Sequence, residues 1–396
     1  MNPPPGPPLV PPAGEAHQRV WFAHAIRGPA CLLVVFAHLF DLFPNQQALV
    51  AQLAHFEPVA GLPSVPWAGA VRFLERLGIS PGTVGVTLFF LVSGFVIPFS
   101  LQNREPRGFF VRRFFRLYPT LWVCLLVTAA TLFVQARVQG TALPYGQGEL
   151  GASALLVSQY TSLPWVEPVL WSLAVEELFY LLAVVLAWPG LLASRVAVLT
   201  AAAGMAAVCV ATKGATAAGP LFWLGFNATY VCFILIGVVV HQLYGRAWAP
   251  VESVAIGAAV FGLYVLGTHH GPATGVANIY IPSSALALAV FGGLFLARDR
   301  LPYSRLLDRL SDISYPLYLL HGINGYLLLR AGYALTGSYY VAVAVTVAAA
   351  LLAATAVHHW VERPTNDFGR RLSRRLRVTA AEEAPYVEGL QAQPVP

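Results

Sequence analysis

Long apolar runs separated by short polar segments make up most of this chain of 396 residues. A helix needs about 20 apolar residues to cross the hydrocarbon core of a membrane. The runs predict ten such helices, at residues 21–43, 83–102, 117–136, 168–188, 195–212, 220–240, 250–268, 281–297, 313–330 and 339–360. The first and fourth are the least regular, because polar residues interrupt them. We therefore expect an all-α, polytopic integral membrane protein.

The composition supports this class and excludes others. Hydrophobic residues make up 57% of the chain and charged residues only 11%, whereas soluble domains carry about 25% charged residues. The net charge of +6 could indicate nucleic-acid binding, but the arginines lie beside the apolar runs. That placement is typical of the cytoplasmic face of a membrane. The expected environment is therefore membrane lipid, with no nucleic-acid partner.

The positions of the basic residues predict the orientation of the chain. If both termini are cytoplasmic, 19 of the 24 lysines and arginines fall on the inner side and five on the outer side. This excess agrees with the positive-inside rule, and an odd number of helices would remove it. The alanine-rich, lysine-poor composition suggests a bacterial source. The predicted location is the bacterial inner (plasma) membrane, with multiple passes.

The four cysteines, Cys31, Cys124, Cys209 and Cys232, all lie inside apolar segments. Their spacing matches no metal-ligand or disulfide pattern, so they are interpreted as packing residues. No metal site is predicted.

The first predicted helix carries ionisable residues in the sequence RGPACLLVVFAHLFD. A helical rise of about 1.5 Å per residue separates Arg27 from His38 by roughly 16 Å along the axis. If Arg27 lies at one interface, His38 lies within the membrane. Ionisable groups at that depth usually line a cavity or pair with another group. His38 is therefore the first candidate for chemistry.

The segment GVTLFFLVSGFVI places Gly85, Ser93 and Gly94 in an apolar helix. Small residues allow close packing of membrane helices, which is the simpler interpretation. Ser93 has no evident base nearby in the sequence and is not predicted to be a nucleophile.

A basic cluster follows in RGFFVRRFFRLYP, where Arg112, Arg113 and Arg116 are three or four residues apart. On a helix, residues at this spacing share a face. Such a patch can contact lipid phosphates at the membrane surface. It can equally hold the phosphates of an anionic substrate, because guanidinium groups bind phosphate through paired hydrogen bonds. The pattern alone leaves both interpretations open.

Two further segments place acids and histidines in apolar surroundings. WSLAVEELFYLL contains Glu176 and Glu177, which point about 100° apart, so at most one can face a given cavity centre. A structural pair with an arginine is the alternative to a functional role. SYPLYLLHG brings His321 into the ninth predicted helix. In HHWVERP, Glu362 and Arg363 are interpreted as an ion pair at a helix end.

In this order and spacing, the motifs resemble those of the membrane-bound acyltransferase 3 family, whose members transfer acyl groups to hydroxyls of sugars, surface polysaccharides and some antibiotics. The resemblance covers about residues 20 to 364. It implies that His38 is the essential histidine and Arg27 the arginine of the same motif. It also implies that Arg113 and Arg116, with Arg112, form the cytoplasmic basic cluster.

The resemblance further implies that Glu176 and Glu177 are the acidic pair of the family. The family commonly has glutamine after this pair, and here Leu178 takes that place. One hydrogen-bonding group is therefore missing, which bears on acceptor specificity more than on the chemistry. The expected domains are a disordered Pro-rich tail (1–19), an acyltransferase 3-like transmembrane domain (20–364) and a cytoplasmic tail that is basic and then flexible (365–396).

The expected function is transfer of an acyl group, with acetyl expected, from acyl-CoA to a hydroxyl of a sugar, polysaccharide or glycosylated metabolite. No permanently bound cofactor is expected, since acyl-CoA is a cosubstrate. His38 would act as general base, and one of Glu176 and Glu177 would orient it or the acceptor. Arg112, Arg113 and Arg116 would hold the phosphates of acyl-CoA. Arg27 would either join these arginines or neutralise a carboxylate.

This mechanism predicts that His38 and the arginine cluster open onto one common chamber. The alternative function is a proton-coupled membrane transporter or flippase, in which His38, Glu176 and His321 form a proton relay. Consumption of a thioester separates these two classes.

Overall fold

The structure, a computed structural model, describes residues 21–101, 106–216 and 219–376. Within these ranges the chain consists of helices and connecting segments, without a β-strand. The tail predicted at residues 1–19 lies outside the described residues. Of the tail predicted at 365–396, residues 365–376 continue the last helix and the remainder lies outside the described ranges.

Eight helical segments in these ranges are long and apolar enough to cross a membrane. They are Trp21–Asn45, Pro81–Leu101 (α6), Pro106–Gln139 (α7), Pro168–Ala187 with α10 (Trp171–Ala187), Pro220–Tyr244 (α12), Pro250–His270 (α13), Thr274–Leu296 with α14 (Ala277–Leu296), and Tyr339–Leu376 with α18 (Tyr339–Val357). Each coincides with one of the ten predicted segments.

The other two predicted segments differ in form. The segment at 195–212 is α11 (Arg195–Ala211), an apolar helix of 17 residues. The segment at 313–330 is divided into α16 (Ser314–Leu320) and α17 (Ile323–Thr336), with a break at His321 and Gly322. The described residues thus confirm a polytopic membrane protein with eight spans by length, while the count of ten stays a prediction.

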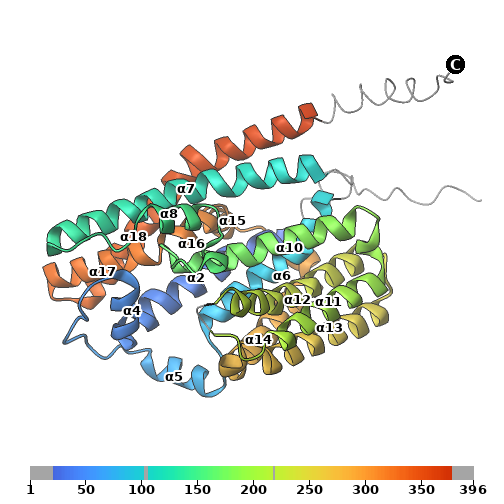
Figure 1. Ribbon diagram of the computed structural model, residues 1–396, viewed down its shortest axis with the longest axis horizontal. Coiled ribbons are helices and arrows are strands. Elements are labelled where there is room, and N and C mark those ends of the chain that lie inside the picture. Colours follow the sequence, from blue (N-terminus) through green and yellow to red (C-terminus); the bar gives the residue numbers. More distant parts are fainter. Residues whose placement is uncertain (1–20, 102–105, 217–218, 377–396) are drawn as a thin grey trace, which may run out of the picture.

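Shorter helices connect these segments and cover the ends of the bundle. They are α4 (Gln47–Ala54), α5 (Ala68–Arg76), α8 (Gln147–Ala154), α9 (Ser158–Thr161) and α15 (Arg305–Asp312). Figure 1 shows α4 and α5 at one end of the molecule, and the C-terminal part of the last helix at the other. We call these the α5 end and the arginine end. The arginine end holds the N-terminal part of α7, where the basic cluster lies.

Helix α6 lies at the centre of the packing. It contacts α12, α14, α10 and α2 (Arg27–Phe36), the first part of the Trp21–Asn45 helix. Helices α11, α12 and α13 form a group on one side of it, while α7, α17 and α18 lie on the other (Figure 1). The charged and polar side chains that enter the interior therefore come from helices that surround α6.

Small residues make the close packing of α6 possible. A Cβ atom on Gly94 would lie 2.0 Å from the carbonyl oxygen of Ile234 on α12, and one on Gly85 would lie 2.5 Å from that of Ala30 on α2. Any larger residue would push these helices apart. The packing role predicted for these two glycines is confirmed.

Two helices contain a π-helical turn, in which one extra residue widens the helix. In the first helix it spans Ala37–Leu42 and includes His38, and the backbone N–H of Phe43 donates to the carbonyl of His38. In the last helix it spans His358–Glu362. Such turns are rare and frequently occur at functional sites. Neither turn can be predicted from the apolar pattern.

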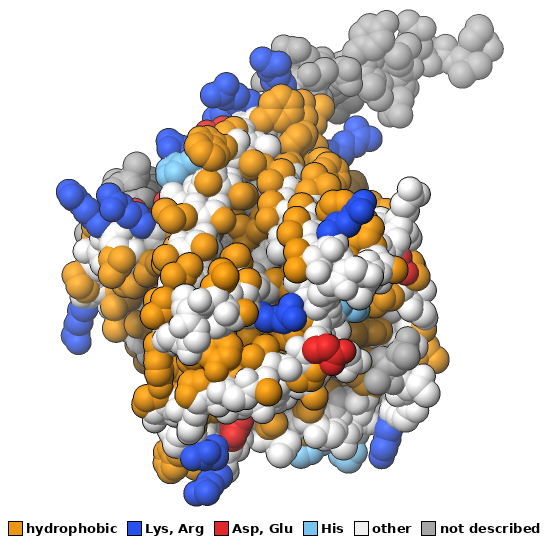
Figure 2. Space-filling model, turned by 90° about the vertical axis from the view of Figure 1, so that its left-hand side faces the viewer, with side chains coloured by type: hydrophobic (Ala, Val, Ile, Leu, Met, Phe, Trp, Pro, Cys, Tyr) orange, Lys and Arg blue, Asp and Glu red, His pale blue; other side chains and the backbone are white. Residues whose placement is uncertain are grey.

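The surface reflects a membrane environment on part of the molecule. Figure 2 looks onto the left-hand side of Figure 1, the α5 end. Hydrophobic side chains cover much of that view, and the charged ones are scattered. Large exposed apolar residues also line the outer faces of the long helices, among them Leu126, Val134, Leu181, Val185 and Leu352. These faces are suited to contact with lipid.

Candidate active site

Three adjoining cavities run through the bundle from the arginine end. The first, which we call the arginine vestibule, has a volume of about 700 Å³. It is lined by His24, Arg27, Ser100, Arg112, Arg113, Arg116, Asp312, His358, His359, Glu362, Arg363, Asn366, Asp367 and Arg370. Most of its lining comes from α7 and from the last helix, so the predicted basic cluster faces residues such as Glu362 and Arg363, more than 200 positions later in the chain.

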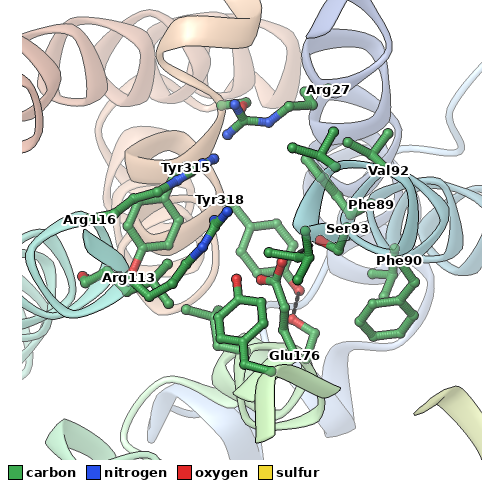
Figure 3. A pocket seen from close by; sticks show the side chains of 18 of the residues that line it. Arg27, Phe89, Phe90, Val92, Ser93, Arg113, Arg116, Glu176, Tyr315 and Tyr318 are labelled. Atoms are coloured by element: carbon green, nitrogen blue, oxygen red, sulfur yellow. Dashed lines mark hydrogen bonds between the residues drawn. The ribbon is translucent and has the colours of Figure 1, made fainter. Parts of the chain in front are cut away.

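The second, which we call the central cavity, has a volume of about 280 Å³ and shares His24, Arg27, Arg113 and Arg116 with the vestibule. Its other walls are mostly apolar. They consist of Ala23, Val86, Phe89, Phe90, Val92, Ser93, Val96, Ile97, Leu117, Ser172, Leu173, Glu176, Tyr180, Ser314, Tyr315 and Tyr318. Figure 3 shows Arg27 from the first helix and Arg113 and Arg116 from α7 pointing toward the same space.

The arginines of α7 are fixed in different ways. Arg112 donates from Nη1 to Ser373 Oγ at 2.5 Å and from Nη2 to the carbonyl of Ser100 at 3.1 Å. Arg113 donates to Ser100 Oγ at 3.3 Å, and its guanidinium lies 5.3 Å from the ring centre of Tyr180. Arg112 therefore faces only the vestibule, whereas Arg113 reaches into the central cavity.

The two glutamates face different surroundings. Glu176 lies in the central cavity and accepts a hydrogen bond from Ser93 Oγ. Glu177 accepts a 2.5 Å hydrogen bond from Tyr118 in a separate pocket between α7 and α10. The structure thus agrees with the geometric argument that only one of them can face a given cavity. It also gives Ser93 a carboxylate partner that the sequence had not revealed.

The third, which we call the histidine cavity, opens toward the α5 end and has a volume of about 390 Å³. Its wall contains no arginine or lysine. It is lined by Val34, Ala37, His38, Asp41, Leu42, Gln46, Glu75, Ile79, Ser80, Pro81, Gly82, Thr83, Val86, Pro168, Val169, Trp171, Tyr230, Ile279, Tyr280 and Tyr318. His38 therefore lies in a different cavity from the arginines.

His38 has a histidine partner that is 283 positions away in the sequence. His38 Nδ1 lies 2.7 Å from His321 Nε2, and His321 is completely buried. The other ring nitrogen of His321, Nδ1, lies 2.7 Å from the carbonyl oxygen of Tyr318 and 3.3 Å from that of Leu317. The two rings form one hydrogen-bonded pair that ends at the backbone of α16.

The partners of this pair assign its protons when both rings are neutral. A carbonyl oxygen only accepts, so His321 Nδ1 carries the hydrogen and its Nε2 is left with a lone pair. His38 Nδ1 must then donate to His321 Nε2. The remaining nitrogen of His38, Nε2, is left as an unprotonated base.

A buried carboxylate holds the helix break beside His321. Glu167 Oε2 accepts a 3.0 Å hydrogen bond from the backbone N–H of Ile323, the first residue of α17. A Cβ atom at position 322 would lie 2.2 Å from Glu167 Oε1, so the carboxylate requires Gly322. Burial raises the pKa of the Glu167 carboxyl to about 8. This contact fixes where α16 ends and therefore where His321 points.

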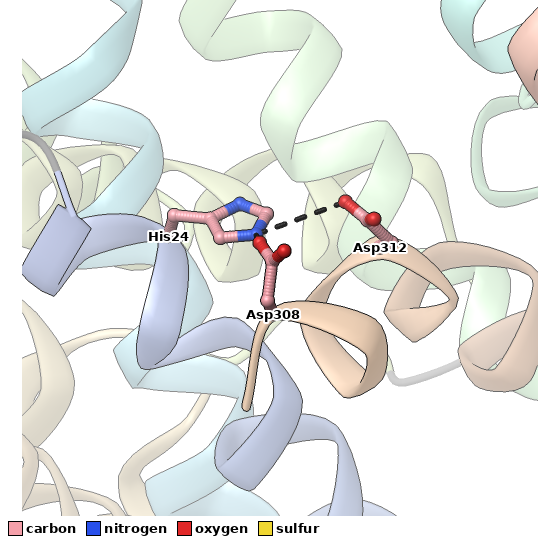
Figure 4. Close-up of side chains that lie close together, drawn as sticks. All are labelled: His24, Asp308 and Asp312. Carbon is pink, nitrogen blue, oxygen red and sulfur yellow. Dashed lines mark hydrogen bonds and ion pairs between the residues drawn. The ribbon is translucent and has the colours of Figure 1, made fainter. Parts of the chain in front are cut away.

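A cluster at the arginine end fixes the start of the first helix. His24 Nε2 lies 3.0 Å from Asp308 Oδ1 and 3.7 Å from Asp312 Oδ1, as Figure 4 shows. Tyr303 also donates to Asp308. One ligand atom from each of His24, Asp308 and Asp312 lies within 4.8 Å of the others, a spacing that could hold a metal ion. The hydrogen bonds already use these groups to join α15 to the first helix.

Comparison with known proteins places this arrangement in a family. The sequence model of one family, described as Acyltransferase domain, matches residues 20–358. The chain belongs to this acyltransferase family. Among its curated relatives, Nodulation protein 10 of Rhizobium leguminosarum bv. viciae is 29% identical over 341 residues, which cover 74% of this chain and 85% of the relative. No solved structure matches the chain.

Two other relatives of this acyltransferase differ in how much they share with it. Acyltransferase MdmB of Streptomyces mycarofaciens is 28% identical over 350 residues, covering 77% of this chain and 86% of the relative. Peptidoglycan O-acetyltransferase OatA of Listeria monocytogenes serovar 1/2a is 31% identical over 131 residues, covering 28% of this chain and 20% of that protein. The resemblance identified from the motifs is thereby confirmed. The protein is a membrane O-acyltransferase, a transferase of groups other than amino-acyl groups.

The structure corrects two expectations about the site of this acyltransferase. His38 and the arginine cluster do not share one chamber, because they line two cavities that meet only at Val86 and Tyr318. His38 is hydrogen-bonded to His321, so neither Glu176 nor Glu177 orients it directly, and the other expected role, orienting the acceptor, stays a prediction. Both errors concern contacts between distant segments, which local spacing does not encode.

The helix-end ion pair expected in the sequence HHWVERP is also different. Glu362 pairs with His358 at 2.8 Å, one π-helical turn earlier, rather than with Arg363. Arg363 instead lines the arginine vestibule. The sequence contains a signal for this position of Arg363, because a second group of basic residues follows the end of the last span.

Proposed function

We propose that this protein transfers an acyl group, with acetyl expected, from acyl-CoA to a hydroxyl of a sugar, polysaccharide or glycosylated metabolite, in a bacterial inner membrane. One observation carries the proposal. The arginine-lined path from one end of the bundle and the histidine cavity from the other adjoin at Val86 and Tyr318, which line both. A charged donor and a neutral acceptor can thus approach each other from opposite ends.

The arginine vestibule suits the phosphates of acyl-CoA. Arg112, Arg113 and Arg116 line it from α7, and Arg363 and Arg370 line it from the last helix. Guanidinium groups bind phosphate through paired hydrogen bonds, and six of them in one cavity, Arg27 included, favour a polyanion. Arg27 lies at the boundary with the central cavity and would neutralise the innermost phosphate.

The central cavity suits the neutral arm of the donor. Its wall is mostly apolar, with Phe89, Phe90 and Val92 from α6, and a few polar groups. Apolar pockets with a small number of polar groups are typical of binding sites for elongated organic ligands. Glu176, held by Ser93, would accept a hydrogen bond from an amide of this arm. Glu177 faces another pocket, so we assign it a structural pair with Tyr118.

His38 is proposed as the general base. Its Nε2 takes the proton of the acceptor hydroxyl while the hydroxyl oxygen attacks the thioester carbon. The carbon–sulfur bond then breaks, and the leaving thiolate receives the proton from His38. In the protonated intermediate, His38 Nδ1–H still donates to His321 Nε2, which orients the ring and stabilises its charge.

The histidine cavity suits a polyhydroxyl acceptor. Asp41, Gln46 and Thr83 offer hydrogen-bonding groups, and Trp171 and Tyr280 offer aromatic faces. Sugars present both hydroxyl groups and apolar C–H faces, which match this combination. One relative is named as a peptidoglycan O-acetyltransferase, which agrees with a carbohydrate acceptor.

The experiment that tests this function uses the purified full chain in lipid nanodiscs. Acetyl-CoA is added with a panel of soluble oligosaccharides and glycosylated metabolites, and release of free CoA thiol is followed together with the mass of the acceptor. We expect thiol release that depends on an acceptor and a mass gain of one acetyl group. An unchanged thioester with every short-chain acyl-CoA would contradict the proposed donor.

A further inference from the structure

Two side chains lie where the central cavity meets the histidine cavity, and we call these two side chains the wall. Val86 on α6 and Tyr318 on α16 line both cavities, and no other residue appears in both linings. Both side chains are largely buried, with 8% of Val86 and 7% of Tyr318 exposed. This wall therefore narrows the junction of the two cavities on the side of His38.

Tyr318 is held firmly in this position. Its hydroxyl lies 2.7 Å from Ser172 Oγ and 3.3 Å from the carbonyl oxygen of Val169, and its ring packs edge-on against Phe89. These partners belong to α6 and to the start of the fourth span. Because the hydroxyl is tied at both contacts, the ring cannot turn aside without breaking hydrogen bonds in a buried site.

The same residue is joined to the catalytic pair. The backbone carbonyl of Tyr318 accepts the hydrogen bond from His321 Nδ1, and His321 in turn lies against His38. The wall and the proposed base are therefore part of one rigid unit. A donor that fills the central cavity from the arginine end brings its acyl group against this wall, beside His38.

From this geometry we propose that Val86 and Tyr318 set the longest acyl group that the enzyme transfers. This inference rests on the proposed function. The thioester must stop where the acceptor hydroxyl and His38 can reach it, so the chain beyond the carbonyl has only the space next to the wall. Val86 is the smaller of the two side chains and limits that space from α6. Removing part of its side chain widens the junction of the two cavities and makes room for a longer acyl group.

The test compares Val86→Ala with the matched control Val92→Ala. Val92 lies on the same helix, is 6% exposed, and lines the central cavity but not the histidine cavity. Both variants lose the same two methyl groups, so they differ in whether the wall is opened. The measurement is kcat/KM for acetyl-, propionyl-, butyryl- and hexanoyl-CoA with one acceptor.

The ratio of interest is kcat/KM for the acyl group one carbon longer than the best wild-type substrate, divided by kcat/KM for that best substrate. We expect Val86→Ala to raise this ratio about tenfold, since one methylene group changes discrimination by roughly 10- to 200-fold. Val92→Ala should leave this ratio within about twofold. Val86→Ile, which adds a methylene group to the wall, should change the ratio in the opposite direction and serves if Val86→Ala does not fold.

The outcomes separate this inference from the proposed function. If wild-type protein consumes no acyl-CoA, the proposed function is wrong and the inference is lost with it. If the wild type is active but Val86→Ala and Val92→Ala change the ratio equally, or Val86→Ala and Val86→Ile leave it unchanged, the wall does not select acyl length and only the inference is overturned.

Discussion

The two ends of the path through this protein differ in chemistry. The arginine vestibule and the central cavity contain the guanidinium groups, while the described residues that line the histidine cavity include two acids and His38 but no arginine or lysine. The first end attracts an anion, and the second repels one. On the proposed function, this difference keeps the two substrates apart by charge until they meet beside His38. It also predicts that variants at the two ends will change different kinetic constants.

The largest effect is expected at the histidine end. His38→Ala removes the proposed base and should lower kcat by about 10²- to 10⁴-fold, because general base catalysis contributes that much. Donor affinity should stay within about twofold of wild type, since His38 does not line the central cavity. Turnover assays at saturating donor measure kcat, and equilibrium binding of acyl-CoA measures donor affinity.

The control for this variant is His55→Ala, which alters a histidine outside all three cavities. Near wild-type turnover of a folded His38→Ala protein would remove His38 from the mechanism. A large loss of donor affinity would instead show that the two ends are not separate.

The next effect is expected at the arginine end. Arg113→Ala and Arg116→Ala each remove a cation from the boundary between the vestibule and the central cavity. Each should weaken acyl-CoA binding about 10- to 100-fold, as expected for hydrogen bonds to charged groups, with kcat changed less. Isothermal titration with a non-hydrolysable acyl-CoA analogue measures the change.

Arg195→Ala is the matched control, because Arg195 is paired with Glu252 on the surface, away from the cavities. Equal donor affinity in all three variants and the wild type would leave the α7 arginines with a lipid-anchoring role only.

A smaller effect is expected where the histidine pair is positioned. His321→Ala leaves His38 Nδ1 without its acceptor, and should lower kcat about tenfold while donor affinity is kept. His321→Gln, whose amide oxygen can still accept, should restore part of the loss. The pH dependence of kcat should also shift in His321→Ala, and a purely structural role would leave that profile in place.

The smallest effect concerns stability rather than turnover. The pKa of Glu167 is raised from 4.5 to about 8, so the folded state favours the protonated form. Its contribution to stability is fully present below about pH 4.5 and is lost as the pH rises toward 8, with a slope of up to about 1.4 kcal/mol per pH unit. Glu167→Gln should flatten this part of the curve of melting temperature against pH in detergent.

Glu57→Gln changes an exposed glutamate and should leave that curve as in the wild type. A Glu167→Gln curve that is parallel to the wild-type curve between pH 4.5 and 8 would contradict the assignment of the buried carboxyl.

The sequence predicted the helices well and the contacts between them poorly. Apolar runs and flanking arginines are local features, and they identified eight spans that the structure contains. The motif residues were also found because His38, Arg113 and Glu176 are ionisable groups in apolar segments. The pairing of His38 with His321 joins the first span to the ninth, and no local pattern encodes such a distance.

The broken ninth segment shows a second limit of sequence reasoning. Gly322 looks like an ordinary small residue within an apolar run, and Glu167 lies in a loop 155 positions earlier. Only their close approach explains why the helix stops there. The same holds for Glu176 and Glu177, whose separation between two pockets depends on how α10 is rotated against α7.

The π-helical turn at Ala37–Leu42 has a consequence for insertions and deletions. Because the turn contains one residue more than an α-helical turn, it sets the helical phase of everything that follows His38, including Asp41 and Gln46 in the histidine cavity. Deleting a single residue between His38 and Phe43 would let this turn close as a regular α-helical turn, so the residues beyond it would keep their direction. The same deletion in a regular helix would rotate them by about 100°. This turn can therefore lose one residue without turning Gln46 away from the histidine cavity.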